Sequence, residues 1–291
     1  MNTRPEFDSL LPRYVQDRRS FLVTTLGAGF ALATQPVMAQ TAIHTAATGL
    51  LEGEVRVPVV DGEMVAYRAR PAGVERPPVV LLVSEIFGVH EYIRDTARRL
   101  AKLGYFVVAP ELFARQGNPQ AVASVAEILE KITARTPDAQ VMSDLDASVR
   151  WAATEGADTG RLAITGFCWG GRISWLYAAH NPGLKAAVAW YGRLVGTANQ
   201  FTPRHPSELV DALKAPVLGL YGGLDSGIPL ETVDAMEAAL KAGGSLAKSS
   251  EIVLYDNAPH AFHADYRPSY RKEEAEDGWR RMLAWFRQNG V

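Results

Sequence analysis

The stretch LAITGFCWGG, residues 162–171, joins an apolar run to a helix-like segment through a turn rich in glycine. The apolar run predicts a buried strand, and residues 171–180 have the spacing of a helix. Gly166 and Gly170 lie two positions before and after Cys168, where glycine lets the two segments pass closely around a strained central residue. The stretch therefore predicts a strand, a sharp turn and a helix, with the Cys168 side chain at the apex of the turn.

Cys168 is the only cysteine in 291 residues, so it cannot form an intramolecular disulfide bond. A nucleophilic serine is the usual residue at the apex of such a turn. The unpaired N–H groups and the dipole of the following helix favour a thiolate there. A lone buried cysteine is otherwise only a small apolar side chain. The flanking glycines favour the interpretation of Cys168 as a nucleophile.

Short apolar runs and helical segments alternate along the chain. Strands are predicted at residues 64–70, 79–84, 106–109, 162–167, 186–190, 217–221 and 252–255, after a lead-in to an edge strand at 45–60, and helices at 92–102, 119–133, 141–154, 171–180, 230–242 and 270–288. Several of these strands lack alternation, as strands buried on both faces require. The pattern predicts one α/β domain, with a mostly parallel sheet, helices on both faces, and a ligand site at the carboxyl ends of the strands.

Two further side chains follow strands in the order that a nucleophile, an acid and a histidine take in this kind of fold. Asp225 comes directly after the apolar run 217–220, and His260 follows the strand 252–255 through a short loop. Alternatives remain open, since loop boundaries are imprecise: His263 for the histidine and Asp256 for the acid. A metal site at His260 and His263 lacks further ligands at recognisable spacing, so we expect no metal.

Composition limits the classes of partner. Hydrophobic residues make up 47% of the chain and charged residues 21%, which suits an ordinary globular core. The net charge is −2, from interspersed basic and acidic residues. We therefore expect no nucleic-acid partner and no binding to an anionic membrane.

The first 39 residues differ from the rest. Arg18 and Arg19 precede Ser-Phe-Leu and an apolar stretch, and the segment ends in Val-Met-Ala at Ala39. A charged region, a short apolar region and a small residue at the end are typical of a signal peptide. The paired arginines resemble the twin-arginine export signal. We expect cleavage after Ala39, export by the twin-arginine machinery, and a periplasmic or secreted domain of residues 40–291 with no transmembrane helix. An ordinary amphipathic helix is the alternative.

From about residue 52 to 288 the chain resembles the dienelactone hydrolase family, the carboxymethylenebutenolidases. The resemblance rests on the segments SEIFGV (84–89) and PELFAR (110–115), the Cys168 turn, GGLD (222–225) and His260. It implies the α/β-hydrolase fold and a hydrolase that opens a lactone or cleaves an ester, its substrate a small molecule, without a metal or organic cofactor. A promiscuous esterase or thioesterase, and a non-catalytic binding protein on the same fold, are the alternatives.

The resemblance also implies roles for individual residues. Cys168, Asp225 and His260 would form the triad, and Glu85 would hold the resting thiol. The backbone N–H groups of Ile86 and Trp169 would form the oxyanion hole. A buried carboxylate at position 85 requires a partner, so a purely structural Glu85 that accepts hydrogen bonds from loop amides is the alternative.

The substrate-binding positions are less regular. The family has a carboxylate-binding arginine shortly after the histidine, but Ala264 stands at the expected position. We therefore expect a weaker preference for substrates with a free carboxylate. Trp169, Trp190 and Tyr191 would bring aromatic surface to the pocket, with Trp190 and Tyr191 as substrate contacts. Burial of the tryptophans as ordinary core residues is the alternative.

Overall fold

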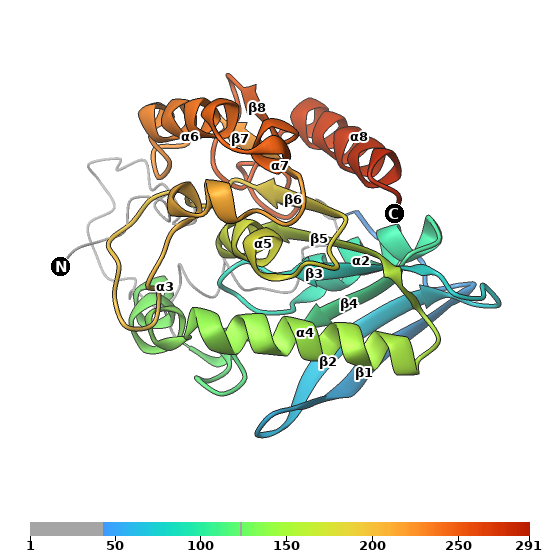
Figure 1. Ribbon diagram of the computed structural model, residues 1–291. Coiled ribbons are helices and arrows are strands. Elements are labelled where there is room, and N and C mark those ends of the chain that lie inside the picture. The colour runs from blue at the N-terminus through green and yellow to red at the C-terminus, as the bar shows by residue number, and fades with distance from the viewer. Residues whose placement is uncertain (1–42, 123) are drawn as a thin grey trace, which may run out of the picture.

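Eight strands form one sheet in the described residues, 43–122 and 124–291 of this computed structural model, in the order β1-β2-β4-β3-β5-β6-β7-β8 (Figure 1). The strands are β1 (Leu50–Val59), β2 (Gly62–Pro71), β3 (Pro78–Val83), β4 (Phe106–Pro110), β5 (Asp158–Phe167), β6 (Ala186–Trp190), β7 (Val217–Gly222) and β8 (Glu251–Tyr255). The pairs β1–β2 and β2–β4 are antiparallel, and the other pairs are parallel. The predicted mostly parallel sheet is confirmed. The predicted signal peptide, residues 1–39, lies outside the described residues.

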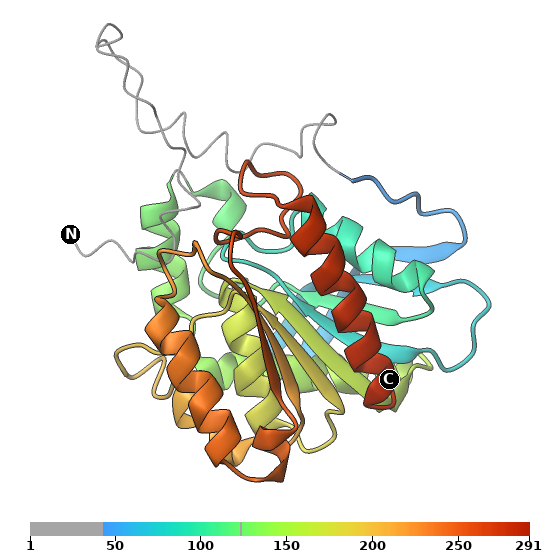
Figure 2. The same cartoon turned by 90° about the horizontal axis from the view of Figure 1, so that it is seen from above.

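Helices cover both faces of the sheet, as predicted. They are α2 (Glu91–Lys102), α3 (Val125–Glu127), α4 (Asp138–Thr154), α5 (Trp169–His180), α6 (Leu230–Ala242), α7 (Ser245–Lys248) and α8 (Lys272–Gln288). Helices α2 and α8 pack on one face, against β2 and β4 and against β6 and β7 (Figure 2). Helices α4 and α5 pack on the other, against strands that include β3, β5 and β6. The strands between them are apolar because each is covered on both sides.

The helix predicted from residue 119 to 133 is wrong as a continuous element. The segment divides into a 3₁₀ turn (Pro119–Ala121), α3, a π-helical turn (Ile128–Ile132) and a second 3₁₀ turn (Thr133–Arg135). The side chain of Asn118 accepts a hydrogen bond from the N–H of Gln120 at 2.9 Å, and the extended residue Ser124 starts a new turn by capping Glu127. Polar side chains that bond to the local backbone interrupt a helix in this way.

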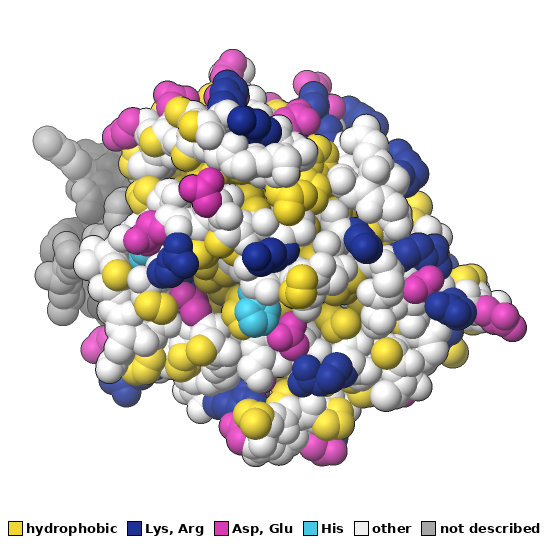
Figure 3. Space-filling view, in the orientation of Figure 1, with side chains coloured by type: hydrophobic (Ala, Val, Ile, Leu, Met, Phe, Trp, Pro, Cys, Tyr) yellow, Lys and Arg dark blue, Asp and Glu magenta, His cyan; other side chains and the backbone are white. Residues whose placement is uncertain are grey.

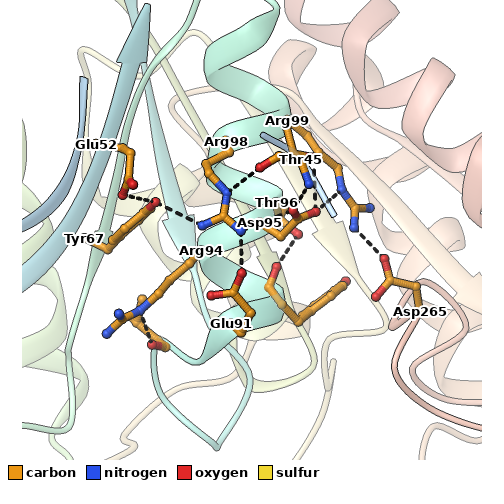
Figure 4. A network of polar contacts seen from close by, with 12 residues as sticks. Thr45, Glu52, Tyr67, Glu91, Arg94, Asp95, Thr96, Arg98, Arg99 and Asp265 are labelled. Atoms are coloured by element: carbon orange, nitrogen blue, oxygen red, sulfur yellow. Dashed lines mark hydrogen bonds and ion pairs between the residues drawn. The ribbon is translucent and has the colours of Figure 1, made fainter. Parts of the chain in front are cut away.

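A polar network fastens the first described residues to α2 (Figure 4). The backbone N–H of Thr45 donates to Asp95 at 2.5 Å, and Arg98 donates to the carbonyl oxygen of Thr45 at 3.0 Å. Arg99 donates to Asp95 at 2.6 Å and to Asp265 at 2.5 Å. Asp265 belongs to the loop between β8 and α8, so this network also holds the loop that carries His260.

Basic and acidic side chains alternate over the face shown in Figure 3, without a large patch of either sign. This face agrees with the interspersed charges of the sequence. Within residues 43–291, apart from residue 123, we find no helix with the length and apolar character required to cross a membrane.

Candidate active site

The turn between β5 and α5 has the predicted shape. Cys168 has φ 56° and ψ −113°, a backbone conformation that is strained for any residue other than glycine. A Cβ atom on Gly166 would collide with the carbonyl oxygen of Gly170, and one on Gly170 would lie 2.7 Å from the carbonyl oxygen of Ser84. The two glycines are therefore required by close backbone packing, which fixes the direction of the Cys168 side chain at the N-terminus of α5.

Asp225 and His260 form a buried pair beside this turn. The Nδ1 atom of His260 lies 2.6 Å from Oδ2 of Asp225, and both side chains are 1% exposed. The second oxygen of Asp225 accepts a hydrogen bond from the N–H of Gly227 at 2.9 Å. Asp225 follows β7 and His260 follows β8, so neighbouring parallel strands bring the two together. The pair leaves Nε2 of His260 without a hydrogen-bond partner among the described residues.

The alternative histidine and acid lie elsewhere. Nδ1 of His263 lies 2.6 Å from the hydroxyl of Tyr92, and the His263 ring stacks between Phe167 and Trp279. Asp256 is exposed. Of the candidates weighed from the sequence, only Asp225 and His260 therefore form a pair.

The protonation states of Cys168 and His260 are coupled. Burial raises the pKa of the Cys168 thiol, the negative charge of Glu85 raises it further, and His260 and the backbone N–H of Trp169 lower it. Burial alone would lower the pKa of His260, but the charges of Asp225 and of the Cys168 thiolate raise it well above its usual value. This arrangement favours His260 as the group that accepts a proton from the thiol.

Glu85 is fully buried and has side-chain partners, not the loop amides considered above. One carboxylate oxygen accepts a hydrogen bond from Tyr266 at 2.8 Å and lies 3.2 Å from Nε2 of His90. The other oxygen lies 4.0 Å from Nε of Arg267 and has no hydrogen-bond partner in the described chain. Burial favours the neutral acid, but His90, the charge of Arg267 and Tyr266 together lower the pKa of Glu85 to about 2. The carboxylate is therefore a poor base, and its effect on the thiol is electrostatic.

Ala264 stands where the family has an arginine, but Arg267 places a guanidinium near the site. It is 9% exposed, and its guanidinium lies over the rings of Phe87 and Tyr266, at 4.9 and 4.6 Å from their centroids. An arginine does therefore reach Glu85, from three positions beyond Ala264. The sequence did not reveal this, because the irregular loop sets which residue turns inward.

Of the two predicted aromatic substrate contacts, Tyr191 faces the cavity and Trp190 faces the core. Tyr191 lines the cavity next to Cys168 and has φ 38°, an unusual value for tyrosine. Trp190 has no exposed surface, donates to Thr165 at 3.1 Å and packs on the ring of Phe262. The expectation that Trp190 contacts a substrate is corrected: in this structure the side chain belongs to the core.

Ile86 and Trp169, whose backbone N–H groups are the predicted oxyanion-hole donors, lie at the ends of neighbouring strands. Trp169 directly follows Cys168 as the first residue of α5, and Ile86 is buried just beyond the end of β3. Strand β3 pairs with β5, so the two backbone N–H groups come from neighbouring strand ends. Their use as a pair of donors stays a prediction.

Cys168 and His260 open into one cavity of about 70 Å³. The lining of this cavity also contains residues that the sequence did not single out, among them Thr133, Arg172 and His205. They come from the interrupted segment after β4, from the first turn of α5 and from the long loop after β6. These irregular segments carry no periodic signal that could have indicated them.

One group of possible metal ligands occurs in the described residues, formed by His44, Glu91 and Asp95. Arg98 already forms ion pairs with both Glu91 and Asp95. The charge of these carboxylates is therefore neutralised by protein groups, and the cluster does not resemble a metal centre.

A strained turn after β5, together with an Asp–His pair from the loops after β7 and β8, defines the α/β-hydrolase class. Residues 64–290 match the dienelactone hydrolase family, and the chain belongs to this family. A protein of Methylorubrum extorquens named "Putative carboxymethylenebutenolidase" is 57% identical over 97% of both chains. One of the same name from Escherichia coli K12 is 51% identical over 92% of this chain and 98% of its own.

The fold recurs in solved structures. The crystal structure of a "Putative Dienelactone Hydrolase" from Klebsiella pneumoniae has a TM-score of 0.79 and 54% sequence identity, covering 82% of this chain and 99% of that one. The more distant "Dienelactone Hydrolase-like Promiscuous Phospotriesterase P91", from metagenomic libraries, has a TM-score of 0.68 at 21% identity and covers 83% of this chain and 99% of its own. This second likeness concerns the fold alone.

Proposed function

We propose that this hydrolase opens a lactone or cleaves an ester through a covalent intermediate on Cys168. The observation that carries the proposal is the convergence of Cys168 and the paired His260 on one cavity. A nucleophile requires a base within reach and a third group that orients the base. Cys168, His260 and Asp225 supply these three parts in that order.

The reaction proceeds in two halves. Sγ of Cys168 attacks the carbonyl carbon while its proton moves to Nε2 of His260, which has no other partner in the described residues. The tetrahedral oxyanion receives hydrogen bonds from the N–H groups of Ile86 and Trp169. The C–O bond then breaks, and His260 returns the proton to the leaving oxygen. A water molecule, deprotonated by His260, hydrolyses the thioester and restores the thiol.

Glu85 keeps the resting thiol protonated in this mechanism. Its charge raises the pKa of Cys168, and its own pKa of about 2 makes it a weaker base than His260. The carboxylate therefore disfavours a free thiolate until a substrate is present. This role specifies how Glu85 would hold the resting thiol, through its charge.

The names of the relatives suggest the type of lactone. Besides the carboxymethylenebutenolidases, a Bradyrhizobium protein named "Probable 2-oxo-3-(5-oxofuran-2-ylidene)propanoate lactonase" is 32% identical over 225 residues. Both names describe an unsaturated five-membered lactone that carries an acidic side chain. We propose a lactone of this kind as the substrate, and export to the periplasm by the segment 1–39 as the route to its location.

Trapping the acyl intermediate tests the proposal. Mixing the protein with 4-nitrophenyl acetate and quenching in acid should add one acetyl group, which peptide mass spectrometry places on Cys168. Cys168→Ala should abolish both the adduct and turnover. Cys168→Ser should also lose most activity, since a hydroxyl is a much weaker acid than a thiol. Undiminished turnover by Cys168→Ala would show that another group performs the reaction.

A further inference from the structure

His90 occupies the N-cap position of α2 without capping the helix. Serine, threonine, aspartate and asparagine are the usual N-caps, because their side-chain oxygens accept from the first free N–H groups of a helix. The His90 side chain makes no such hydrogen bond. It turns back to the loop after β3, where its Nε2 lies 3.2 Å from Oε2 of the fully buried Glu85. The side chain at the start of α2 therefore serves the buried carboxylate and not the helix.

Three aromatic rings fix the position of the His90 ring. It stacks on Tyr92 with 5.9 Å between the centroids, and it packs edge-to-face against Phe87 and Tyr266 at 6.3 and 5.2 Å. The His90 side chain is 16% exposed, whereas that of Glu85 has no exposed surface. The ring is therefore held against Glu85 and can still exchange a proton with water.

Glu85 is held by His90, Tyr266 and Arg267, and of these only histidine is a residue type that changes charge between about pH 5 and 8. Burial raises the pKa of Tyr266 well above the usual value of a tyrosine. Burial lowers the pKa of Arg267, but the charges of Tyr266 and Glu85 outweigh this and raise it above its usual value. Within this group of four, a change of pH near neutrality therefore acts through His90.

The other titratable and charged side chains around His90 have partners of their own. Glu111 accepts from the N–H of Val89 at 3.0 Å, Arg94 donates to the carbonyl oxygen of Val89 at 3.3 Å, Glu91 pairs with Arg98, and His263 contacts the hydroxyl of Tyr92. Burial raises the pKa of Glu111, but this carboxylate faces the backbone of Val89. Burial lowers the pKa of His263 to about 3, so its ring is neutral above pH 5. None of these four side chains forms a hydrogen bond or an ion pair with Glu85.

The charge of Glu85 extends to the thiol. Burial raises the pKa of Cys168, and the charge of Glu85 raises it further. A protonated imidazole 3.2 Å from Glu85 offsets part of this negative charge. A neutral imidazole can donate a hydrogen bond to the carboxylate but carries no charge to offset it. The thiol therefore ionises more readily when His90 is protonated.

We propose that His90 is a positioning residue that acts through Glu85, so that Glu85 opposes ionisation of the Cys168 thiol strongly at high pH and weakly at low pH. The proposal rests on the proposed role of Glu85 and extends it to a second side chain. Its consequence is a flatter dependence of thiol reactivity on pH. As the pH falls and thiolate is lost, protonation of His90 offsets part of the loss.

Alkylation by iodoacetamide tests this without turnover, because Cys168 is the only cysteine. His90→Gln keeps an N–H donor for Glu85 but cannot carry a charge. At pH 6 the variant should react about threefold more slowly than the wild type, the change expected if the charge shifts ionisation of the thiol by about half a pH unit. At pH 9, where a histidine is neutral, the two rates should agree. His180→Gln, at an exposed histidine paired with Asp146, is the matched control and should follow the wild type at both pH values.

A merely structural role of His90 gives a different result. If the ring only held Glu85 in place, His90→Gln would react like the wild type at pH 6, because the donor is retained. His90→Asn also lacks the charge and introduces a preferred N-cap, so it keeps α2 if His90→Gln does not fold. In a Glu85→Gln background the same change at His90 should lose most of its effect at pH 6, since no carboxylate remains to be offset.

The outcomes separate His90 from the mechanism. Equal rates of His90→Gln and wild type at pH 6 would overturn the proposal, and so would an equal slowing with and without Glu85. A shift of the alkylation profile in Glu85→Gln, with none in the His90 variants, would reject His90 and leave the role of Glu85 intact. An unchanged profile in Glu85→Gln would reject both. Failure of Cys168 as the nucleophile would appear elsewhere, in the acyl-trapping experiment.

Discussion

Replacing Asp225 with asparagine tests the orientation of His260 most directly. In the structure one oxygen of Asp225 accepts from the N–H of Gly227 at 2.9 Å, and the other faces Nδ1 of His260 at 2.6 Å. Asparagine has a single side-chain oxygen, and Gly227 requires an acceptor. The amide nitrogen would therefore face His260 and donate to Nδ1. The imidazole would then carry its proton on Nε2 and could not accept one from the Cys168 thiol.

The size of the effect follows from the loss of this base. Reversing the tautomer of a triad histidine lowers kcat by about 10⁴-fold where a serine must be deprotonated. A thiol ionises more readily, so we expect about 10³-fold here, equivalent to about 4 kcal/mol in the activation barrier. The direction in which this loss of activity changes with pH also follows. Without Asp225 the thiol must ionise without help from His260, so the deficit should shrink as the pH rises.

The assay is the turnover of 4-nitrophenyl acetate from pH 6 to pH 9, with thermal unfolding as a check on the fold. Asp256→Asn makes the same chemical change at an exposed residue in the loop after β8 and should retain wild-type turnover. A folded Asp225→Asn protein with kcat within tenfold of the wild type would refute the role of the pair. So would a deficit that stays constant up to pH 9.

Three further changes have defined outcomes. Glu85→Gln removes a charge that raises the pKa of Cys168, so alkylation by iodoacetamide should extend to lower pH; an unchanged profile would show that Glu85 is only structural. Gly170→Ala places a Cβ atom 2.7 Å from the carbonyl oxygen of Ser84 and should destabilise the protein by at least about 1–3 kcal/mol in urea unfolding, whereas wild-type stability would contradict the packing argument. Arg18→Lys with Arg19→Lys should retain a reporter fused to residues 1–40 in the cytoplasm, and export in a strain without the twin-arginine system would disprove that signal.

The sheet could be predicted from the sequence because its strands are buried on both faces. Such strands appear as continuous apolar runs, as in residues 79–83 and 217–220. The positions of Cys168, Asp225 and His260 were predictable for a related reason. Each directly follows one of these runs or a turn after it, and parallel strands deliver their carboxyl ends to one edge of the sheet.

The rest of the site depends on geometry that local sequence does not encode. Trp190 and Tyr191 are adjacent, but successive residues at a strand end point to opposite sides, so only Tyr191 reaches the cavity. Thr133 and His205 lie in segments without periodicity, and tertiary contacts alone bring them together. Arg267 reaches Glu85 because the loop after β8 turns it inward, which spacing from His260 could not predict.

Two buried carboxylates act on the thiol in opposite directions. Asp225 raises the pKa of His260 and thereby favours transfer of the thiol proton to it, whereas Glu85 raises the pKa of Cys168 and opposes ionisation. Both effects are strong because burial limits screening by water. A substrate that enters the cavity excludes more water and supplies a carbonyl that takes up the negative charge, beyond the sulfur on which Glu85 acts. The opposition from Glu85 therefore acts most on the empty site, where a free thiolate would be exposed to oxidation and alkylation.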